Sequence, residues 1–214
     1  IFTNILLADE INRASPRTQS SLLESMAEAQ ATIEGERHAL PTPFMVLATQ
    51  NPIEFQGTYP LHEAQLDRFL VHMDLGYADA ETELNILYDQ QITHPLETIS
   101  PVASLADVID LQQKATQVHV AREVGRYIVD VVRATREHAD VQMGASPRGA
   151  LGVFHLSQAL ALMDGRDHVR PEDVQEAAEP VLSHRIVLET KARYGGLDKS
   201  DVINGVLKQV KVPT

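Results

Sequence analysis

Apolar residues follow two different patterns along the chain. In the N-terminal part, two apolar runs of strand length, residues 5–8 and 44–49, are each followed by polar residues. Such runs are typical of strands in a parallel sheet that is covered on both faces. After residue 101, apolar positions recur with the 3.6-residue period of helices. The pattern predicts an α/β part followed by an all-helical bundle.

Further elements of the α/β part are indicated by local signals. Ser15 before Pro16 is a hydroxyl cap with proline at the first helical position, which predicts a helix after residue 15. Residues 30–33 and 37–40 flank Gly35 and predict a β-hairpin. The apolar run 69–75 is interpreted as the last strand of the sheet, and an acidic helix at 80–91 completes this part.

The helical part begins after a proline-containing stretch, residues 93–101, which is interpreted as a linker. Five helices are predicted, at about 104–115, 121–137, 150–163, from about 169 onwards, and 198–210. The second carries a core-facing stripe formed by Val124, Tyr127, Ile128, Val131, Val132 and Thr135. The predicted division is therefore 1–92 for the α/β part, 93–101 for the linker and 102–214 for the helical domain.

Composition narrows the classes of protein. The 214 residues include 30 acids against 18 lysines and arginines, a net charge of −12. A large nucleic-acid interface needs a clustered basic face, which the sequence lacks, so no nucleic-acid partner is expected. Cysteine is absent, which excludes disulfides and thiolate metal sites. No apolar run approaches the length of a membrane span, and no signal peptide is found, so a cytoplasmic location is the default.

The two acids after the first strand, Asp9 and Glu10, are the first candidates for chemistry. Ligands gather at the C-terminal ends of parallel strands. Neighbouring residues leaving a strand point to different sides, so one carboxylate can hold a cation while the other handles a water. That division of labour suits metal-assisted phosphoryl transfer. Solvated acids at the end of a buried strand are the alternative, and these residues alone do not decide between the two.

Three longer motifs decide the matter. They are Asp9-Glu-Ile-Asn-Arg-Ala14, Ala48-Thr-Gln-Asn-Pro52 and Leu66-Asp-Arg-Phe-Leu70. Together with the strand before Asp9 they resemble the MoxR family of AAA+ ATPases, closely from residue 2 to about 75 and more loosely through the C-terminal helices. The resemblance implies the C-terminal part of an AAA+ P-loop ATPase core, a parallel sheet with helices, followed by an all-α lid.

The resemblance also implies a role for each candidate residue. Asp9 and Glu10 correspond to the Walker B pair: Asp9 would hold Mg²⁺, largely through water, and Glu10 would polarise the water that attacks the γ-phosphate of ATP. Asn51 corresponds to sensor 1, which positions that water. Arg68 corresponds to the arginine finger, which reaches the nucleotide of the neighbouring subunit. Arg148, in the first turn of its helix, corresponds to sensor 2, which binds the γ-phosphate from the lid.

The phosphate-binding motif G-x-x-x-x-G-K-[ST] does not occur in the sequence. In the family this loop precedes Walker B, and the chain begins at Ile1, so we expect it to be the C-terminal part of a longer ATPase. The piece alone is expected to be inactive and to bind ATP weakly or not at all. A non-hydrolytic protein-interaction module therefore stays open as an alternative.

The family implies a chaperone-like machine that remodels, activates or assembles a protein client. Its members form rings, typically hexamers, often work with von Willebrand factor A domain proteins, and sometimes aid metal insertion into the client. A magnesium chelatase-like subunit and a replicative helicase are alternatives within the superfamily. The acidic hairpin, with Glu34 and Glu36 at its turn, argues against the helicase. The sequence does not identify the client.

Overall fold

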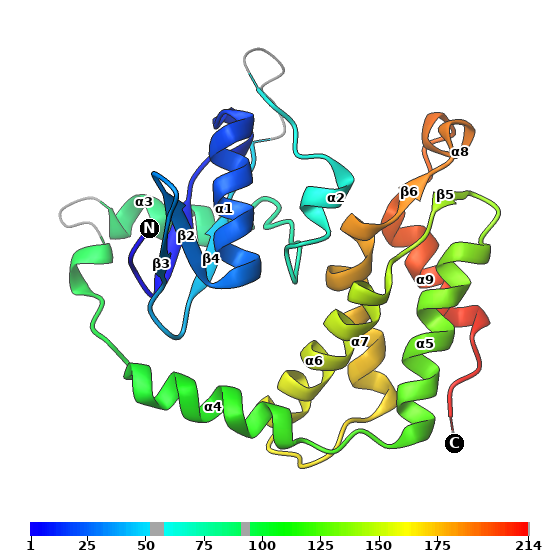
Figure 1. Cartoon of the computed structure of the whole chain (residues 1–214). Coiled ribbons are helices and arrows are strands. Elements are labelled where there is room, and N and C mark those ends of the chain that lie inside the picture. Colours follow the sequence, from blue (N-terminus) through cyan, green and yellow to red (C-terminus); the bar gives the residue numbers. More distant parts are fainter. Residues whose placement is uncertain (52–57, 91–94, 214) are drawn as a thin grey trace.

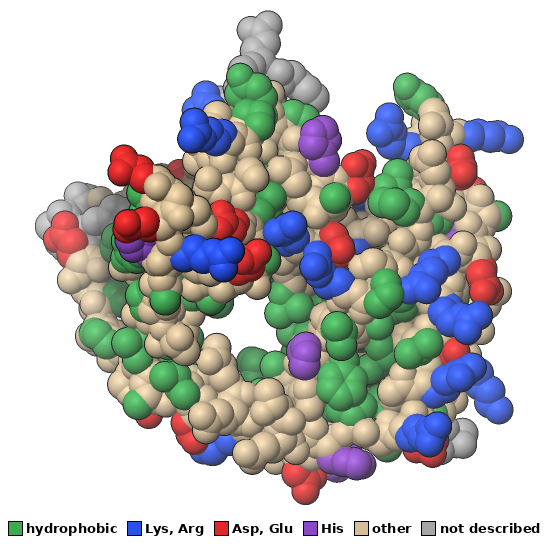
Figure 2. Space-filling model, viewed as in Figure 1, with side chains coloured by type: hydrophobic (Ala, Val, Ile, Leu, Met, Phe, Trp, Pro, Cys, Tyr) green, Lys and Arg blue, Asp and Glu red, His purple; other side chains and the backbone are tan. Residues whose placement is uncertain are grey.

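The chain folds into an α/β body and a helical body, joined by a long helix. The computed structural model describes residues 1–51, 58–90 and 95–213. Helix α4 (Leu105–Gln117) runs between the two bodies along one side of the molecule (Figure 1). Figure 2 shows an opening through the molecule, bounded by the two bodies and the connecting segment. Residues 91–94 lie outside the described residues, and they include the start of the predicted linker at residue 93.

A parallel pair of strands is the centre of the α/β body. Strands β1 (Ile5–Ala8) and β4 (Met45–Ala48) pair from Ile5 opposite Met45 to Ala8 opposite Ala48, so both predicted strands are confirmed. Helix α1 (Pro16–Glu28) begins after Ser15, whose hydroxyl accepts the Thr18 N–H at 3.2 Å. Leu22 of α1 joins Ile11 and Leu61 in the core that covers one face of this sheet.

The other face of the sheet is open to solvent in the described part of the chain. The side chains that point to it are Ile5, Leu7, Met45 and Leu47, exposed by 59, 63, 49 and 49%. The prediction that both strands are covered on both faces is therefore wrong for these residues. The physical reason is that α1 packs on one side only, and strand residues alternate between faces.

The predicted last strand, residues 69–75, is also wrong. A strand needs a neighbour to pair its N–H and C=O groups, and this stretch follows α2 (Glu63–Leu66) as irregular chain. Its backbone turns to the helical body instead: the His72 N–H donates to the Pro180 carbonyl at 2.9 Å. Helix α3 (Ala80–Asp89) forms as predicted, but its Leu84 and Leu87 are exposed and do not complete a covered sheet.

The predicted hairpin is confirmed. Strands β2 (Gln30–Ile33) and β3 (Glu36–Ala39) pair antiparallel around a two-residue turn. Glu34 and Gly35 in this turn both have positive φ, 52° and 87°, as the favoured type of two-residue hairpin turn requires. Gly35 meets that demand without steric cost, whereas Glu34 does not.

The helical body has one buried core. Four helices surround it: α5 (Arg122–Glu137), α6 (Pro147–Met163), α7 (Pro171–Leu182) and α9 (Lys199–Gln209). The six predicted stripe residues of α5 are all buried. Helix α6 includes Pro147, three residues before the predicted residue 150, and the Ser146 hydroxyl caps it by accepting the Arg148 N–H at 3.2 Å, as the Ser146-Pro147 pair in the sequence indicates.

Several short elements have no strong sequence pattern. Strands β5 (Val141–Met143) and β6 (Val187–Leu188) pair antiparallel, and α8 (Thr190–Tyr194) is a single turn and a half. Three 3-10 turns complete the set: η1 (Ile11–Arg13), η2 (Pro95–Thr98) and η3 (Ser183–Arg185). The expectation that everything after the linker is helical is thus wrong at β5 and β6. Among the described residues, the helices are too short or too polar to cross a membrane.

Candidate functional site

The ends of β1 and β4 are joined by one threonine. The Thr49 hydroxyl donates to the Asp9 carboxylate at 2.5 Å and accepts the Glu10 N–H at 2.9 Å. Backbone bonds continue the contact on both sides, because the Thr49 N–H donates to the Ala8 carbonyl and the Ile11 N–H to the Thr49 carbonyl, each at 3.0 Å. Asp9 is therefore held at the sheet edge with its carboxylate exposed.

Glu10 leaves the strand in a left-handed backbone conformation, with φ 48° and ψ 52°. This region is uncommon for a residue with a side chain. It turns the chain sharply into η1 and separates the Glu10 side chain from that of Asp9. The Glu10 carboxylate accepts a hydrogen bond from the Arg13 guanidinium at 2.8 Å, which orients it.

Asn51 is brought to the same edge at the end of β4. The side-chain amide of Asn12 donates to the Asn51 carbonyl at 3.2 Å, and Asn12 is 8% exposed. The buried Asn12 therefore fixes the Asn51 backbone near the turn that carries Asp9 and Glu10. Three predicted site residues thus lie together, while Pro52 of the same motif is outside the described residues.

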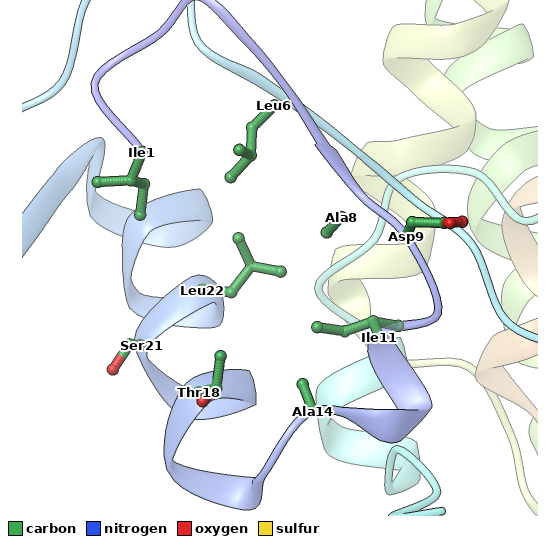
Figure 3. Close-up of a pocket in the computed structure, with 9 residues that line it drawn as sticks. All are labelled: Ile1, Leu6, Ala8, Asp9, Ile11, Ala14, Thr18, Ser21 and Leu22. Atoms are coloured by element: carbon green, nitrogen blue, oxygen red, sulfur yellow. The ribbon is translucent and has the colours of Figure 1, made fainter.

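An apolar groove lies beside Asp9, between β1 and α1 (Figure 3). It has a volume of about 320 Å³ and is lined by residues including Leu6, Ile11 and Leu22. Figure 3 shows the Asp9 carboxylate directed away from these apolar side chains. The lining of the groove is mainly apolar, so its chemistry does not suit phosphate.

The other two predicted residues lie at the junction with the helical body. The Arg68 guanidinium donates to the Leu23 carbonyl of α1 at 3.1 Å. Arg148 lies in the first turn of α6, where its guanidinium is 3.5 Å from the Asp67 carboxylate. Its side chain is 55% exposed, and that end of a helix favours anions. Arg148 is thus placed where a bound anion could attract it away from Asp67.

Sequence reasoning missed three residues of this region: Thr49, Asp67 and Arg185. Asp67 precedes the predicted finger and carries a signal, an acid directly before Arg68. Arg185 has only a weak one, a charged residue just before the apolar residues Ile186 and Val187. Arg185 as a whole residue is 5% exposed, and its guanidinium pairs with the Asp67 carboxylate at 2.9 Å. Burial lowers the pKa of Arg185 from its usual value, and Asp67 opposes that shift.

A wider cleft of about 650 Å³ opens between the two bodies. Gln50, the neighbour of Asn51, lines it on one side, and Lys199 of α9 lines it on the other. Its volume is in the range of ligand sites. Burial lowers the pKa of Lys199, and the acids Glu63 and Asp198 oppose that shift. Four acids line the cleft, namely Asp74, Glu176, Glu179 and Asp198. These acids are not accompanied by the adjacent Asp9-Glu10 pair that the Mg²⁺-dependent chemistry requires, so the edge near Asn51 is the better candidate site.

Family models match both bodies. Residues 1–71 match the ATPase family associated with various cellular activities (AAA), and residues 133–205 match an AAA lid domain. The chain is 46% identical to the uncharacterized protein YeaC of Bacillus subtilis over 213 residues, all of the chain and 67% of that protein. It is 43% identical to the chaperone MoxR1 of Mycobacterium tuberculosis, over all of the chain and 58% of that protein. The chain belongs to the MoxR family of AAA+ ATPases.

The fold agrees with this MoxR-family assignment. The solved structure of an ATPase candidate from Cytophaga hutchinsonii superposes with a TM-score of 0.94 at 37% identity, covering all of the chain and 68% of that structure. An AAA+ core followed by a helical lid, the predicted fold class, is therefore confirmed. The chain spans 58–67% of the length of the two curated relatives above.

Proposed function

We propose that the complete gene product containing this chain is an ATP-hydrolysing machine of MoxR type that remodels, activates or assembles a protein client. The observation that carries this proposal is the placement of Asp9 and Glu10 beside Asn51 at one edge of a parallel sheet. The name of the relative MoxR1, a chaperone, supports the class of activity. Assistance with metal insertion into the client is the finer possibility within this class.

Asp9 is the proposed Mg²⁺ ligand. Mg²⁺ prefers oxygen ligands, keeps several waters, and is commonly held by one or two carboxylates plus substrate phosphates. The exposed carboxylate of Asp9 at the end of β1 is the single protein ligand that this mode of binding requires. When bound, the ion would neutralise charge on the ATP phosphates. Thr49 would keep the Asp9 carboxylate in place through its hydrogen bond.

Glu10 and Asn51 are the proposed residues for the attacking water. A carboxylate can accept the proton of that water, and a carboxamide can both donate to a phosphate oxygen and accept from the water. The ion pair with Arg13 aims the Glu10 carboxylate, and Asn12 anchors the Asn51 backbone. Arg148 would move from Asp67 to the γ-phosphate when ATP is bound.

Arg68 is the proposed finger for the nucleotide of a neighbouring subunit. This role requires assembly into a ring, for which we propose a hexamer, and hydrolysis then depends on protein concentration. Arginines supplied in trans contribute about 10³ to 10⁵ in rate in other nucleotide hydrolases. We further propose a cytoplasmic location and a protein client, including von Willebrand factor A domain proteins as candidate partners.

A magnesium chelatase-like role receives less support. A chelatase subunit of Chlamydomonas reinhardtii is 25% identical over 96% of this chain, well below the 43% of MoxR1. The net charge of −12 continues to argue against a nucleic-acid motor. A non-hydrolytic interaction module would show itself as an absence of turnover in the experiment below.

The test is Mg²⁺-dependent ATP hydrolysis by the complete gene product over a range of protein concentrations. Three variants accompany the parent: Glu10→Gln, Arg68→Ala and, as a matched control, Arg126→Ala, which removes a lid arginine with a 71% exposed side chain. We expect the parental hydrolysis rate per subunit to rise with protein concentration. In Glu10→Gln and in Arg68→Ala this rate should fall about 10³-fold. Arg126→Ala should retain the parental rate.

Parental turnover by Glu10→Gln would contradict the proposed chemistry. A parental rate in Arg68→Ala, or a rate per subunit that is independent of concentration, would contradict the shared site. No turnover by the parent at any concentration would favour the interaction module.

A further inference from the structure

The segment 67–72 is held by both bodies of the molecule. On the side of the α/β body, Arg68 donates to the Leu23 carbonyl, and Phe69 packs against the core of that body. On the side of the lid, the Asp67 carboxylate pairs with Arg185, and the His72 N–H donates to the Pro180 carbonyl at 2.9 Å. Arg68, the proposed finger, therefore lies in a segment that contacts the lid at both ends, through Asp67 and through His72.

Arg185 makes most of the lid's hydrogen bonds to the segment 67–72. Its Nε donates to the Asp67 carboxylate at 2.9 Å. Its Nη2 donates to the Asp67 carbonyl at 3.1 Å and to the Phe69 carbonyl at 2.5 Å, and its Nη1 donates to the Leu70 carbonyl at 3.1 Å. Nη1 also donates to the Val181 carbonyl. One guanidinium thus fixes the main chain on both sides of Arg68.

The geometry of this contact requires arginine. The Arg185 side chain is 2% exposed, and its planar group presents donors in several fixed directions at once. A lysine ammonium is a compact charge that can reach the Asp67 carboxylate or some of the carbonyls, but not the whole set. Replacing Arg185 by lysine would keep the charge and lose the hold on the 67–70 backbone.

Asp67 links these contacts to Arg148, the lid arginine proposed to bind the γ-phosphate. Its carboxylate accepts from the Ser146 hydroxyl at 3.3 Å and lies 3.5 Å from Arg148, while its pair with Arg185 is shorter, 2.9 Å. Ser146 also caps α6, on which Arg148 sits. If a phosphate draws Arg148 away, Asp67 therefore stays bound to Arg185 and to the helix cap.

We propose that Arg185 is a positioning residue that couples the lid to Arg68, so that the lid and the finger of one subunit move together. This inference rests on the function proposed above. When a nucleotide repositions the lid, the finger offered to the neighbouring subunit is repositioned with it. The lid thereby influences hydrolysis in the neighbouring subunit through the position of Arg68.

The test compares Arg185→Lys and Asp67→Asn with the parent in the complete gene product. Asp67→Asn removes one charge and leaves the backbone carbonyls available to Arg185. The matched control is Arg166→Lys, because Arg166 is also a lid arginine with a mostly covered side chain, 14% exposed, but its carboxylate partners Asp164 and Asp173 both lie in the lid. Thermal unfolding identifies any variant that fails to fold. If Arg185→Lys fails to fold, Asp67→Asn provides the test.

A finger acts on the transition state in the neighbouring site, so we expect kcat to fall about tenfold or more in Arg185→Lys, with KM for ATP within about twofold. In Asp67→Asn, which keeps the contacts of Arg185 with the backbone carbonyls, we expect a smaller fall of about fivefold, again with KM within about twofold. Arg166→Lys should keep kcat within about twofold. Each test substitution is also placed in an Arg68→Ala background and assayed by single turnover. There it should have no further effect, because a residue that acts only through Arg68 has nothing left to position.

A further tenfold loss in the Arg68→Ala background would overturn the inference, because Arg185 would then act independently of the finger. So would a raised KM with unchanged kcat. An Arg68→Ala variant with the parental rate, or a parent without turnover, would instead refute the proposed function on which the inference rests.

Discussion

The Thr49 hydroxyl donates to the Asp9 carboxylate at 2.5 Å and so ties together the ends of two parallel strands. The same oxygen accepts the Glu10 N–H, so one side chain organises both acids of the candidate site. If Asp9 binds Mg²⁺, Thr49 is a residue that orients a metal ligand without touching the metal.

The first prediction concerns this hydroxyl. Thr49→Val keeps the shape of the side chain and removes the hydrogen bond, so we expect the Mg²⁺ concentration for half-maximal ATP hydrolysis to rise about tenfold. Thr49→Ser keeps the hydroxyl and should behave like the parent. Titration of Mg²⁺ at saturating ATP in the complete gene product measures the effect. Equal midpoints for Thr49→Val and the parent would show that the Asp9–Thr49 contact is irrelevant to the metal.

The second prediction is a pH dependence of stability. Burial, together with the nearby charge of Arg185, lowers the pKa of His184 from 6.5 to about 4, while its contact with the Phe69 carbonyl opposes the shift. The unfolded chain therefore binds a proton as the pH falls through about 6.5, whereas the folded chain keeps this imidazole neutral down to about 4. His184 thus lowers the free energy of unfolding over this window, by at most about 1.4 kcal/mol per pH unit.

Urea unfolding at several pH values between 7 and 4 measures this slope. The control is His184→Gln, which retains a hydrogen-bonding side chain and does not titrate. The groups that face His184, namely Arg185, His72 and Asp67, are present in both proteins. We expect the variant to lose less stability than the parent over the window. Parallel curves for the two proteins would contradict the prediction.

The third prediction concerns the anchor of α7. The Asp173 carboxylate accepts from Arg166 at 2.6 and 2.8 Å and from the Arg170 N–H at 2.7 Å. Burial raises the pKa of Asp173, but the hydrogen bonds from Arg166 and Arg170 outweigh it and hold that pKa below its usual value. Asp173→Ala should lower the free energy of unfolding by about 2 kcal/mol, because it removes the two hydrogen bonds that Arg166 makes to Asp173, leaving Asp164 as the acid paired with Arg166, and it removes a helix cap.

The matched control for Asp173→Ala is Asp130→Ala, which breaks an exposed i,i+4 pair with Arg126. That change should cost about 0.5 kcal/mol or less, because exposed ion pairs contribute little. Chemical denaturation of the three proteins gives the comparison. If the two alanine variants lose similar stability, the Asp173 network is not the anchor that its geometry indicates.

The fourth prediction uses two glycines of the lid. A Cβ on Gly144 would lie 2.6 Å from the Arg136 Cα, and the following residue is fixed because the Arg136 guanidinium donates to the Ala145 carbonyl at 2.8 Å. Gly144→Ala should therefore destabilise the protein by about 2 kcal/mol or more. Gly125→Ala, inside α5 and with nothing within 4 Å of its Cβ position, should stabilise it by about 0.8 kcal/mol. Opposite shifts in thermal midpoint are expected, and shifts of the same sign would contradict the packing argument.

The lid was largely predictable because its signals are local. Helical period and caps such as Ser104 and Ser146 lie within a few residues of the helices they start, and the α5 stripe is buried as predicted. The run 69–75 shows the limit of such signals. Its apolar character was correctly read, but whether an apolar run becomes a strand depends on a partner strand elsewhere in the chain.

The candidate site also contains residues that the sequence predicts and residues that it does not. The resemblance to the MoxR family predicts that Asp9, Glu10 and Asn51 serve one site, and the parallel pairing of β1 with β4 brings the ends of their strands to one edge of the sheet. Their chemical roles stay predictions. Arg185 could not be found because most of its partners are backbone carbonyls, and any residue type provides those. A buried arginine and an exposed one look alike in a sequence until the fold supplies the contacts.

The left-handed backbone of Glu10 sets stability and activity against each other at one position. A residue with a side chain pays about 1 kcal/mol or more to hold φ at 48°, and glycine would not. Glu10→Gly should therefore give a chain that unfolds less readily and, on the proposed mechanism, hydrolyses no ATP. On the proposed mechanism, this strain is the cost of aiming the Glu10 carboxylate.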